Sequence, residues 1–470
     1  MDHAAPIGVT VGDWRHEVRR LAALGIPAAL TQLGWMMLGI VDTAMVGHLG
    51  VVELDAAALG HIWTFGTLIF GMGIVFGMDP IVSQAFGARD RDRVVVTLQR
   101  GLILAVAIGI PITIAWMFTE PVLLAMGQDP RLAAGAQTYV QVQLPSVIPF
   151  LAFTALRQYL QGQGIVAPAL YATIVANLFN VAANWALIYG HLGFAPMGLR
   201  GAGLATGATR AMLLVLLAAW VWRSHLRRDL AARPEQPAWS WTGLREILGH
   251  GIPVGIQYGL EGWAFQIATL LAGRLGEVPL AAHVIVLNLA SLAFMLPLGV
   301  SIGAATRVGN LVGAGERIAA QRSAMISLLM GAAVMAGSAI LFLIARDGLP
   351  RLFTGDDATI AAAATILPIA AAFALFDGTQ VVGGGILRGM GRTRPAAVFN
   401  IVAFYVLGLP AAWGLAFSLG WGLTGLWWGL CLGLMAVAAA LVVYLWRRGP
   451  ATVSAPAGLE QSAHQARERE

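Results

Sequence analysis

Apolar runs long enough to cross a membrane recur along the whole chain, and this feature constrains its fold more than any other. Between Asp357 and Arg388 lie thirty residues, of which Asp377 is the only ionisable one. About twenty apolar residues suffice for a helix to span the hydrocarbon core of a bilayer. The chain is 58% hydrophobic and only 11% charged, whereas soluble domains carry about 25% charged residues. We therefore predict an all-α integral membrane protein.

The apolar runs predict twelve transmembrane helices in two lobes that a polar linker separates. The predicted spans are 21–45, 54–78, 94–118, 132–156, 165–189, 198–222, 247–273, 280–304, 321–345, 358–386, 395–418 and 422–446. The predicted parts of the chain are a cytoplasmic N-terminal segment at 1–20, an N-lobe at 21–222, a cytoplasmic linker at 223–246, a C-lobe at 247–446 and a disordered cytoplasmic tail at 447–470. In the N-terminal segment, Trp14, Val18 and Leu21 favour a short interfacial helix over the solvated start of span 1.

Arginine supplies all 29 basic residues and predicts the orientation of the spans. With the N-terminus inside the cell, 23 arginines fall in inside segments and five in outside loops. Basic residues gather in cytoplasmic loops, so we expect both termini in the cytoplasm. The remaining arginine, Arg210, lies early in span 6, where we expect a snorkelling or structural role. The arginine- and alanine-rich composition is typical of a GC-rich bacterial genome, and we expect the protein in the bacterial inner membrane.

The second half of the chain repeats the first at an offset of 226 residues. GIPAALTQLGWMMLGIVDTAMVGHLGVVELDAA, from Gly25, aligns with GIPVGIQYGLEGWAFQIATLLAGRLGEVPLAAH, from Gly251. Six spans are thus repeated in the same orientation. Parallel repeats imply two six-helix bundles, related by a pseudo-two-fold axis along the membrane normal, that can rock around a central cavity. The alternative is that the duplication only makes a stable scaffold.

Three acidic residues, Asp42, Glu261 and Asp377, lie well inside predicted spans. A charge at the bilayer centre costs about 2.5–3.5 kcal/mol on insertion scales, so we expect each acid to face a cavity, bind an ion or hold a proton. The repeat aligns each of them with a residue that is not acidic, so folding alone does not require acids at both equivalent positions. These three are the candidate cation-coupling residues. The alternative for each is a buried acid that a neighbouring amide satisfies.

Amide side chains accompany the acids at helical spacing. In the C-lobe, one amide lies four residues before Glu261 and another lies three residues after Asp377. In span 5, three amides are spaced i, i+3 and i+7, which places them on one helix face. These amides are Gln257, Gln380, Asn177, Asn180 and Asn184. Amide oxygens can coordinate Na⁺ or accept a hydrogen bond from a protonated acid. Buried amides also hold membrane helices together, which is the alternative for span 5.

Three aromatic residues and one further acid complete the candidates. Trp35, Trp263 and Phe265 can contact a flat organic cation by stacking and cation–π attraction, with core packing or an interfacial belt as the alternative. Asp79 precedes Pro80 near the predicted end of span 2. We expect Asp79 to be a helix-end residue close to water.

Together these features resemble the multidrug and toxic compound extrusion (MATE) family, in particular its NorM-like members, over residues 20–446. The motifs that carry the resemblance are VDTAMVGHLG at 41–50, SQAFGARD at 83–90, LQGQG at 160–164, QYGLEGWAF around Glu261 and FDGTQVVGGGILRGMG at 376–391. The resemblance implies a V-shaped pair of six-helix bundles that exports organic cations, such as drugs or toxic metabolites, in exchange for H⁺ or Na⁺.

The resemblance also implies residue roles. Asp42, Glu261 and Asp377 match the acids of spans 1, 7 and 10. Asn180, Asn184 and Thr206 match an N-lobe cation site of some relatives, which have Asp where this chain has Asn184. This departure favours coupling in the C-lobe, with any Na⁺ bound at Glu261 and Asp377.

Other functions are less consistent with the sequence. A lipid-linked precursor flippase of the same superfamily would carry basic residues in its cavity, and a polytopic membrane enzyme would need a catalytic dyad or a metal cluster at a membrane face. The chain contains no GxxxxGK[ST] or HExxH motif, and its single cysteine, Cys431, excludes an intrachain disulfide. We expect a monomeric transporter without enzymatic activity, cofactor or nucleic-acid partner, in contact with organic cations and the lipid bilayer.

Overall fold

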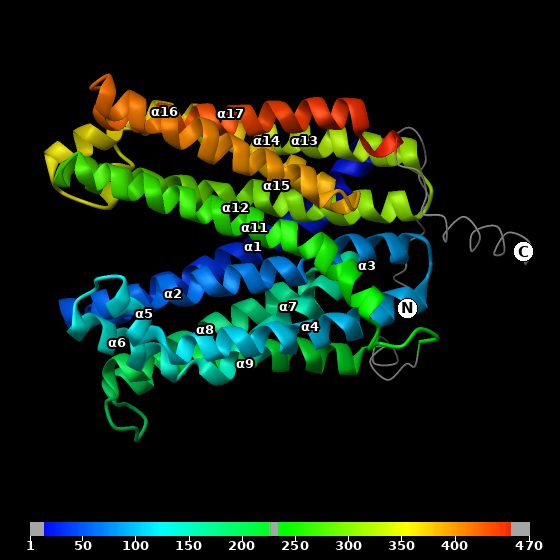
Figure 1. The fold of residues 1–470 in the computed structure, drawn as a ribbon, viewed down its shortest axis with the longest axis horizontal. Coiled ribbons are helices and arrows are strands. Elements are labelled where there is room, and N and C mark those ends of the chain that lie inside the picture. The colour runs from blue at the N-terminus through cyan, green and yellow to red at the C-terminus, as the bar shows by residue number, and fades with distance from the viewer. Residues whose placement is uncertain (1–13, 225, 227–233, 453–470) are drawn as a thin grey trace, which may run out of the picture.

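A computed structural model describes residues 14–224, 226 and 234–452, and these residues form helices without any strand. Two bundles lie side by side (Figure 1). The N-lobe consists of α1 (Trp14–Gly47), α2 (Val51–Val75), α3 (Met78–Gly87), α4 (Arg91–Met117), α5 (Thr119–Ala125), α6 (Pro130–Gln141), η1 (Leu144–Ser146), α7 (Val147–Gly162), α8 (Ala167–Tyr189) and α9 (Gly198–Arg223). The C-lobe consists of α11 (Trp241–Arg274), α12 (Glu277–Gly313), α13 (Arg317–Ile344), η2 (Pro350–Leu352), α14 (Asp357–Gly389), α15 (Thr393–Ile401), η3 (Val402–Gly408), α16 (Leu409–Trp413), η4 (Gly414–Ser418), α17 (Gly422–Arg448) and η5 (Pro450–Thr452).

The helices form twelve spanning segments, six in each lobe, which confirms the predicted fold class. In the described part of the chain, ten helical segments are long and apolar enough to cross a bilayer, and α6 with η1–α7 makes one more, bent by 45°. The bend falls where Pro145, which has no amide hydrogen to donate, interrupts the helix. The twelfth segment is α11, whose 34 residues are of spanning length but include several polar side chains.

The ends of several spans differ from the sequence prediction, among them the start of the first span and the two ends of the linker. α1 begins at Trp14 and continues through Pro27 to Gly47, so Trp14, Val18 and Leu21 belong to the first spanning helix and not to a separate interfacial helix. α9 ends at Arg223 and α11 begins at Trp241, which shortens the linker. Residues 1–13, most of the linker and the predicted disordered tail beyond Thr452 lie outside the described residues.

The two lobes meet through contacts that repeat with the sequence. α1 packs on α12, and α2 packs on α11. Gly25 lies against Gly299 and Val300, while Gly251, its equivalent in the repeat, lies against Ile74. A side chain at either glycine would meet the backbone of the other lobe, so the chains approach closely there. We call the end of the molecule where α1 begins and α17 finishes the termini end. The bundles meet at this end and diverge toward α6 and α16 (Figure 1).

Candidate functional site

The N-lobe acid, Asp42, lies in a hydrogen-bonded cluster between α1, α8 and α9. One carboxylate oxygen accepts a hydrogen bond from Asn184 Nδ2 at 2.6 Å, and the other accepts one from Thr206 Oγ1 at 2.6 Å. Asn184 also donates to Asn180 Oδ1 at 3.2 Å, because the two amides lie one turn apart on α8. Asp42 and both asparagines are buried. Both oxygens of this acid therefore have a protein donor.

Two other polar residues of the N-lobe act as helix-joining groups. Asn177 donates to the carbonyl oxygens of Gly34 at 3.0 Å and Thr173 at 2.9 Å, so it ties α8 to α1 and does not join the cluster around Asp42. Arg210 of α9 donates to Gln143 Oε1 at 3.0 Å and lies over the ring of Phe150. These contacts fit a structural role for Arg210.

The C-lobe acids lie close together between α11 and α14. Gln380 Nε2 donates to Glu261 Oε2 at 3.3 Å and to Asn400 Oδ1 at 3.0 Å, which connects α14 to both α11 and α15. Asp377 is one turn before Gln380, is 5% exposed and is close enough to Glu261 for their charges to interact. In the described part of the chain, no hydrogen-bond donor reaches the Asp377 carboxylate. The remaining amide, Gln257, lies against Gly384 of α14.

The glycine run beyond Asp377 brings α14 close to its neighbours. Gly383 faces Leu441 of α17, and Gly385 faces the backbone of Ser301 in α12. Ser301 Oγ donates to the carbonyl oxygen of Val381 at 2.7 Å. Since α14 is one continuous helix from Asp357 to Gly389, these glycines serve close packing.

The three candidate aromatic residues have different surroundings. Trp35 packs against Phe150 in the N-lobe, with ring centroids 5.6 Å apart. Phe265 packs against Phe373 and Phe404 in the C-lobe, with ring centroids 6.1 and 5.8 Å away. Trp263 is exposed. Core packing therefore accounts for two of the three rings, and Trp263 is the one of the three that is exposed.

The oxygen ligands around the C-lobe acids suit a hard monovalent cation or a proton. Carboxylate and amide carbonyl oxygens are supplied by Glu261, Asp377, Gln380 and Asn400, and hard cations prefer such ligands. Among the described residues, no three side chains of the His, Cys, Asp and Glu types gather as they do around a transition metal. Asn400 was missed in the sequence, although it is the only amide side chain in span 11.

A second buried charged group lies at the termini end, and sequence reasoning missed it. Asp79 was expected near water, but it is 2% exposed, accepts a hydrogen bond from Gln161 Nε2 at 3.2 Å and lies 3.7 Å from Arg388 Nε. Asp79 does lie in the first turn of α3, but the expectation of nearby water is wrong because the C-lobe covers α3. The internal repeat of the sequence indicated a relation between the two partners of Asp79, since Gln161 in LQGQG aligns with Arg388 in LRGMG. Residues at equivalent positions of the two lobes thus both contact the Asp79 carboxylate.

Comparison with known proteins identifies what the chain is similar to. The MatE family model matches residues 27–186 and 253–414, one match in each lobe. A probable multidrug resistance protein NorM from Bradyrhizobium diazoefficiens is 34% identical over 449 residues, which cover 94% of this chain and 96% of that protein. Multidrug and toxin extrusion protein 1 from Xenopus tropicalis is 33% identical, over 92% of this chain and 74% of that protein.

Solved structures show the same fold at lower sequence identity. A eukaryotic MATE transporter superposes with a TM-score of 0.84 at 22% identity, over 97% of this chain and 99% of that chain. A multidrug resistance transporter of the MATE family in an outward-facing conformation superposes with a TM-score of 0.82 at 19% identity, over 95% of this chain and 97% of that chain.

Proposed function

This chain belongs to the MatE family, and on that premise we propose that it is a secondary transporter that exports organic cations in exchange for H⁺ or Na⁺. Its relatives are named for multidrug resistance and for multidrug and toxin extrusion. The proposal takes from these names the direction of transport and a broad class of substrate. The acids and amides of the two lobes supply the chemistry that such an exchange needs.

The observation that carries the proposal is the arrangement of Glu261 and Asp377. Two ionised carboxylates repel each other in a region of low dielectric, and a shared proton or a bound cation relieves this repulsion. Gln380 Nε2 donates a hydrogen bond to Glu261 Oε2 at 3.3 Å, whereas the Asp377 carboxylate accepts no hydrogen bond from the described residues. An incoming organic cation competes for the same negative charge. Competition for one site therefore couples the two fluxes.

The packing of the lobes supports alternating access as the transport mechanism. Contacts between the lobes gather at the termini end, and the bundles diverge at the other end (Figure 1). The arginine distribution favours a cytoplasmic termini end, so this arrangement corresponds to an outward-facing state in the bacterial inner membrane. We further propose that one chain, as a monomer, contains a complete transport path, because both lobes belong to it.

Efflux measurements test the proposal. Ethidium is added outside everted vesicles that contain the protein, and its uptake is followed while an H⁺ or a Na⁺ gradient is imposed separately. We expect one of the gradients to drive ethidium transport, and we expect the variant with Glu261→Gln and Asp377→Asn to lose this response. Ethidium movement that follows neither gradient would contradict the exchange mechanism. Movement of a lipid-linked pyrophosphate in place of ethidium would identify the protein as a flippase.

A further inference from the structure

Ion pairs join the two lobes at the termini end. In each of three pairs, one partner belongs to the N-lobe and the other to the C-lobe. The pairs are Glu17–Arg307 at 2.8 Å, Arg93–Glu246 at 2.6 Å and Asp79–Arg388 at 3.7 Å. The Asp79–Arg388 pair is the most buried of the three, with side chains 3% and 9% exposed. Water screens a buried pair less than a surface pair, and removal of one partner leaves the other charge buried and unpaired.

Arg388 is the centre of this buried group. Its Nη1 donates to the Tyr258 hydroxyl of α11 at 2.6 Å, and its Nη2 donates to Ser301 Oγ of α12 at 3.4 Å. The guanidinium thus connects two C-lobe helices to Asp79 of the N-lobe. Phe76, the residue after α2, also packs edge-on against Tyr258, with ring centroids 6.0 Å apart. Any separation of the lobes at the termini end must break the Asp79–Arg388 and Phe76–Tyr258 contacts, which cross between the lobes.

Two amide contacts flank the buried group and follow the repeat. Gln84 Nε2 of α3 donates to the carbonyl oxygen of Gly389 in α14 at 2.9 Å. Asn310 of α12, in the amide orientation that satisfies both of its polar atoms, donates to the carbonyl oxygen of Gly162 in α7 at 3.0 Å. Gln84 aligns with Asn310 in the repeat, and Gly162 with Gly389. Each lobe therefore holds the other through an equivalent hydrogen bond.

The helices of the buried group also carry the C-lobe acids. Tyr258 and Glu261 are three residues apart on α11, while Asp377 and Arg388 both lie on α14. Rigid helices transmit a displacement along their length. A movement between α11 and α14 that changes the Glu261–Asp377 separation therefore also changes the Tyr258–Arg388 hydrogen bond.

We propose that Asp79, Arg388 and Tyr258 form a gate that keeps the lobes together at the termini end, and that α11 and α14 link this gate to occupancy of the C-lobe acids. The inference rests on the proposed transport function. The gate opens when the lobes separate at this end, which breaks the contact between Asp79 and Arg388. The two amide contacts align the closed lobes.

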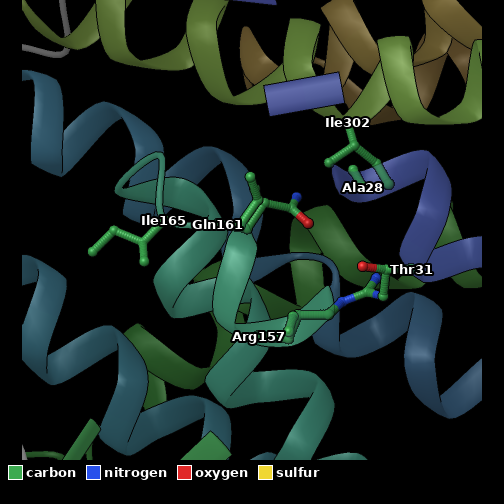
Figure 2. A pocket seen from close by; sticks show the side chains of 8 residues that line it. Ala28, Thr31, Arg157, Gln161, Ile165 and Ile302 are labelled. Atoms are coloured by element: carbon green, nitrogen blue, oxygen red, sulfur yellow. The ribbon is translucent and has the colours of Figure 1, made fainter. Parts of the chain in front are cut away.

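A buried reporter cysteine tests the gate without any transport measurement. Ala28 of α1 is 6% exposed and lies beside Ile302 of α12, at the interface of the lobes (Figure 2). Ala28→Cys is introduced together with Cys431→Ala, and its labelling by a charged thiol reagent is followed in purified protein. Labelling reports gate opening even in a chain that exports no organic cation. A failure of the gate is therefore distinguishable from a failure of the proposed function.

We expect Asp79→Asn to raise the labelling rate at least tenfold, because Arg388 loses its partner in the N-lobe. Tyr258→Phe removes one hydroxyl and should raise the rate by a smaller factor. Tyr189→Phe is the matched control, since the Tyr189 hydroxyl donates to Met45 inside the N-lobe. Asp347→Asn, in an exposed pair outside the interface, is the control for loss of charge. Size-exclusion profiles identify folded variants, and Tyr258→Phe carries the test if Asp79→Asn does not fold. If the labelling rates of Asp79→Asn and Tyr258→Phe equal those of the controls, the gate proposal is wrong.

A double-variant cycle tests the link to the acids. We expect Asp377→Asn to change the labelling rate of Ala28→Cys when Tyr258 is present and to have a much smaller effect in the Tyr258→Phe variant. Such non-additivity is the signature of coupled residues. Independent, multiplicative effects of the two substitutions on the rate would show that the gate and the acids are not linked.

Discussion

At the scale of single residues, the acids of the two lobes have different hydrogen-bond donors and different neighbouring charges. Asp42 has a donor for each carboxylate oxygen, whereas Asp377 has a second carboxylate nearby and no donor among the described residues. A hydrogen-bonded carboxylate is stabilised in its ionised form, and a pair of carboxylates requires a proton or a cation. This difference favours ion exchange in the C-lobe.

The first prediction concerns Glu261 and Asp377. Glu261→Gln and Asp377→Asn should each abolish the release of H⁺ or Na⁺ on drug addition, because each removes one of the two interacting charges. Drug binding should persist through apolar and aromatic contacts. The measurement is ion release from reconstituted protein, with drug binding determined in parallel. If both variants release ions at the wild-type stoichiometry, the two acids do not couple the fluxes.

The second prediction concerns Asp42. Asp42→Asn should reduce efflux by at least tenfold without loss of folding, because the amide oxygen still accepts from Asn184 while the negative charge is lost. Thr206→Ser keeps the hydroxyl that donates to Asp42 and serves as the control with nearly normal efflux. Both variants are compared by drug efflux at equal expression in intact cells. Wild-type efflux in Asp42→Asn would show that Asp42 is a structural acid.

At the scale of elements, close contact between helices decides how the lobes meet. Gly251 on α11 faces the carbonyl oxygen of Ile74 on α2, whereas Gly262 on the same helix has no atom within 4 Å of the place a Cβ would take. Replacement of a helical glycine by alanine usually stabilises a helix by about 0.5–1 kcal/mol. The surroundings of the two glycines therefore predict opposite effects.

The third prediction compares these glycines. Gly251→Ala should lower the melting temperature and raise the labelling rate of Ala28→Cys, because the new methyl group pushes α11 away from α2. Gly262→Ala should leave the labelling rate unchanged and keep or raise the melting temperature. Equal behaviour of the two variants would mean that the lobes tolerate a wider separation at the termini end than their packing indicates.

At the scale of the whole molecule, orientation determines the direction of export. Glu235, in the linker, and Arg274, at the far end of α11, are both exposed, and Cys431 is buried.

The fourth prediction is that Glu235→Cys, in a Cys431→Ala background, resists impermeant thiol reagents added to intact cells. Arg274→Cys should react readily under the same conditions. The reverse pattern would invert the proposed topology and the proposed direction of transport.

The sequence by itself determined the class, the number of spans and the two-fold repeat, because hydrocarbon thickness and helix rise dictate how many apolar residues a span needs. The family resemblance implied a site of Asn180, Asn184 and Thr206, and the four-residue spacing that puts both asparagines on one helix face is a local property. The tertiary structure decided that Asp42 of α1 joins them. Asp79 was predicted to lie near water and Arg388 was not singled out, because each lies near a helix end that resembles a solvated loop. Only the tertiary structure decided that the opposite lobe covers them. Burial between the lobes depends on contacts between residues about 300 positions apart in the sequence, such as Gln84 and Gly389. A pattern within a short stretch of sequence cannot predict such contacts.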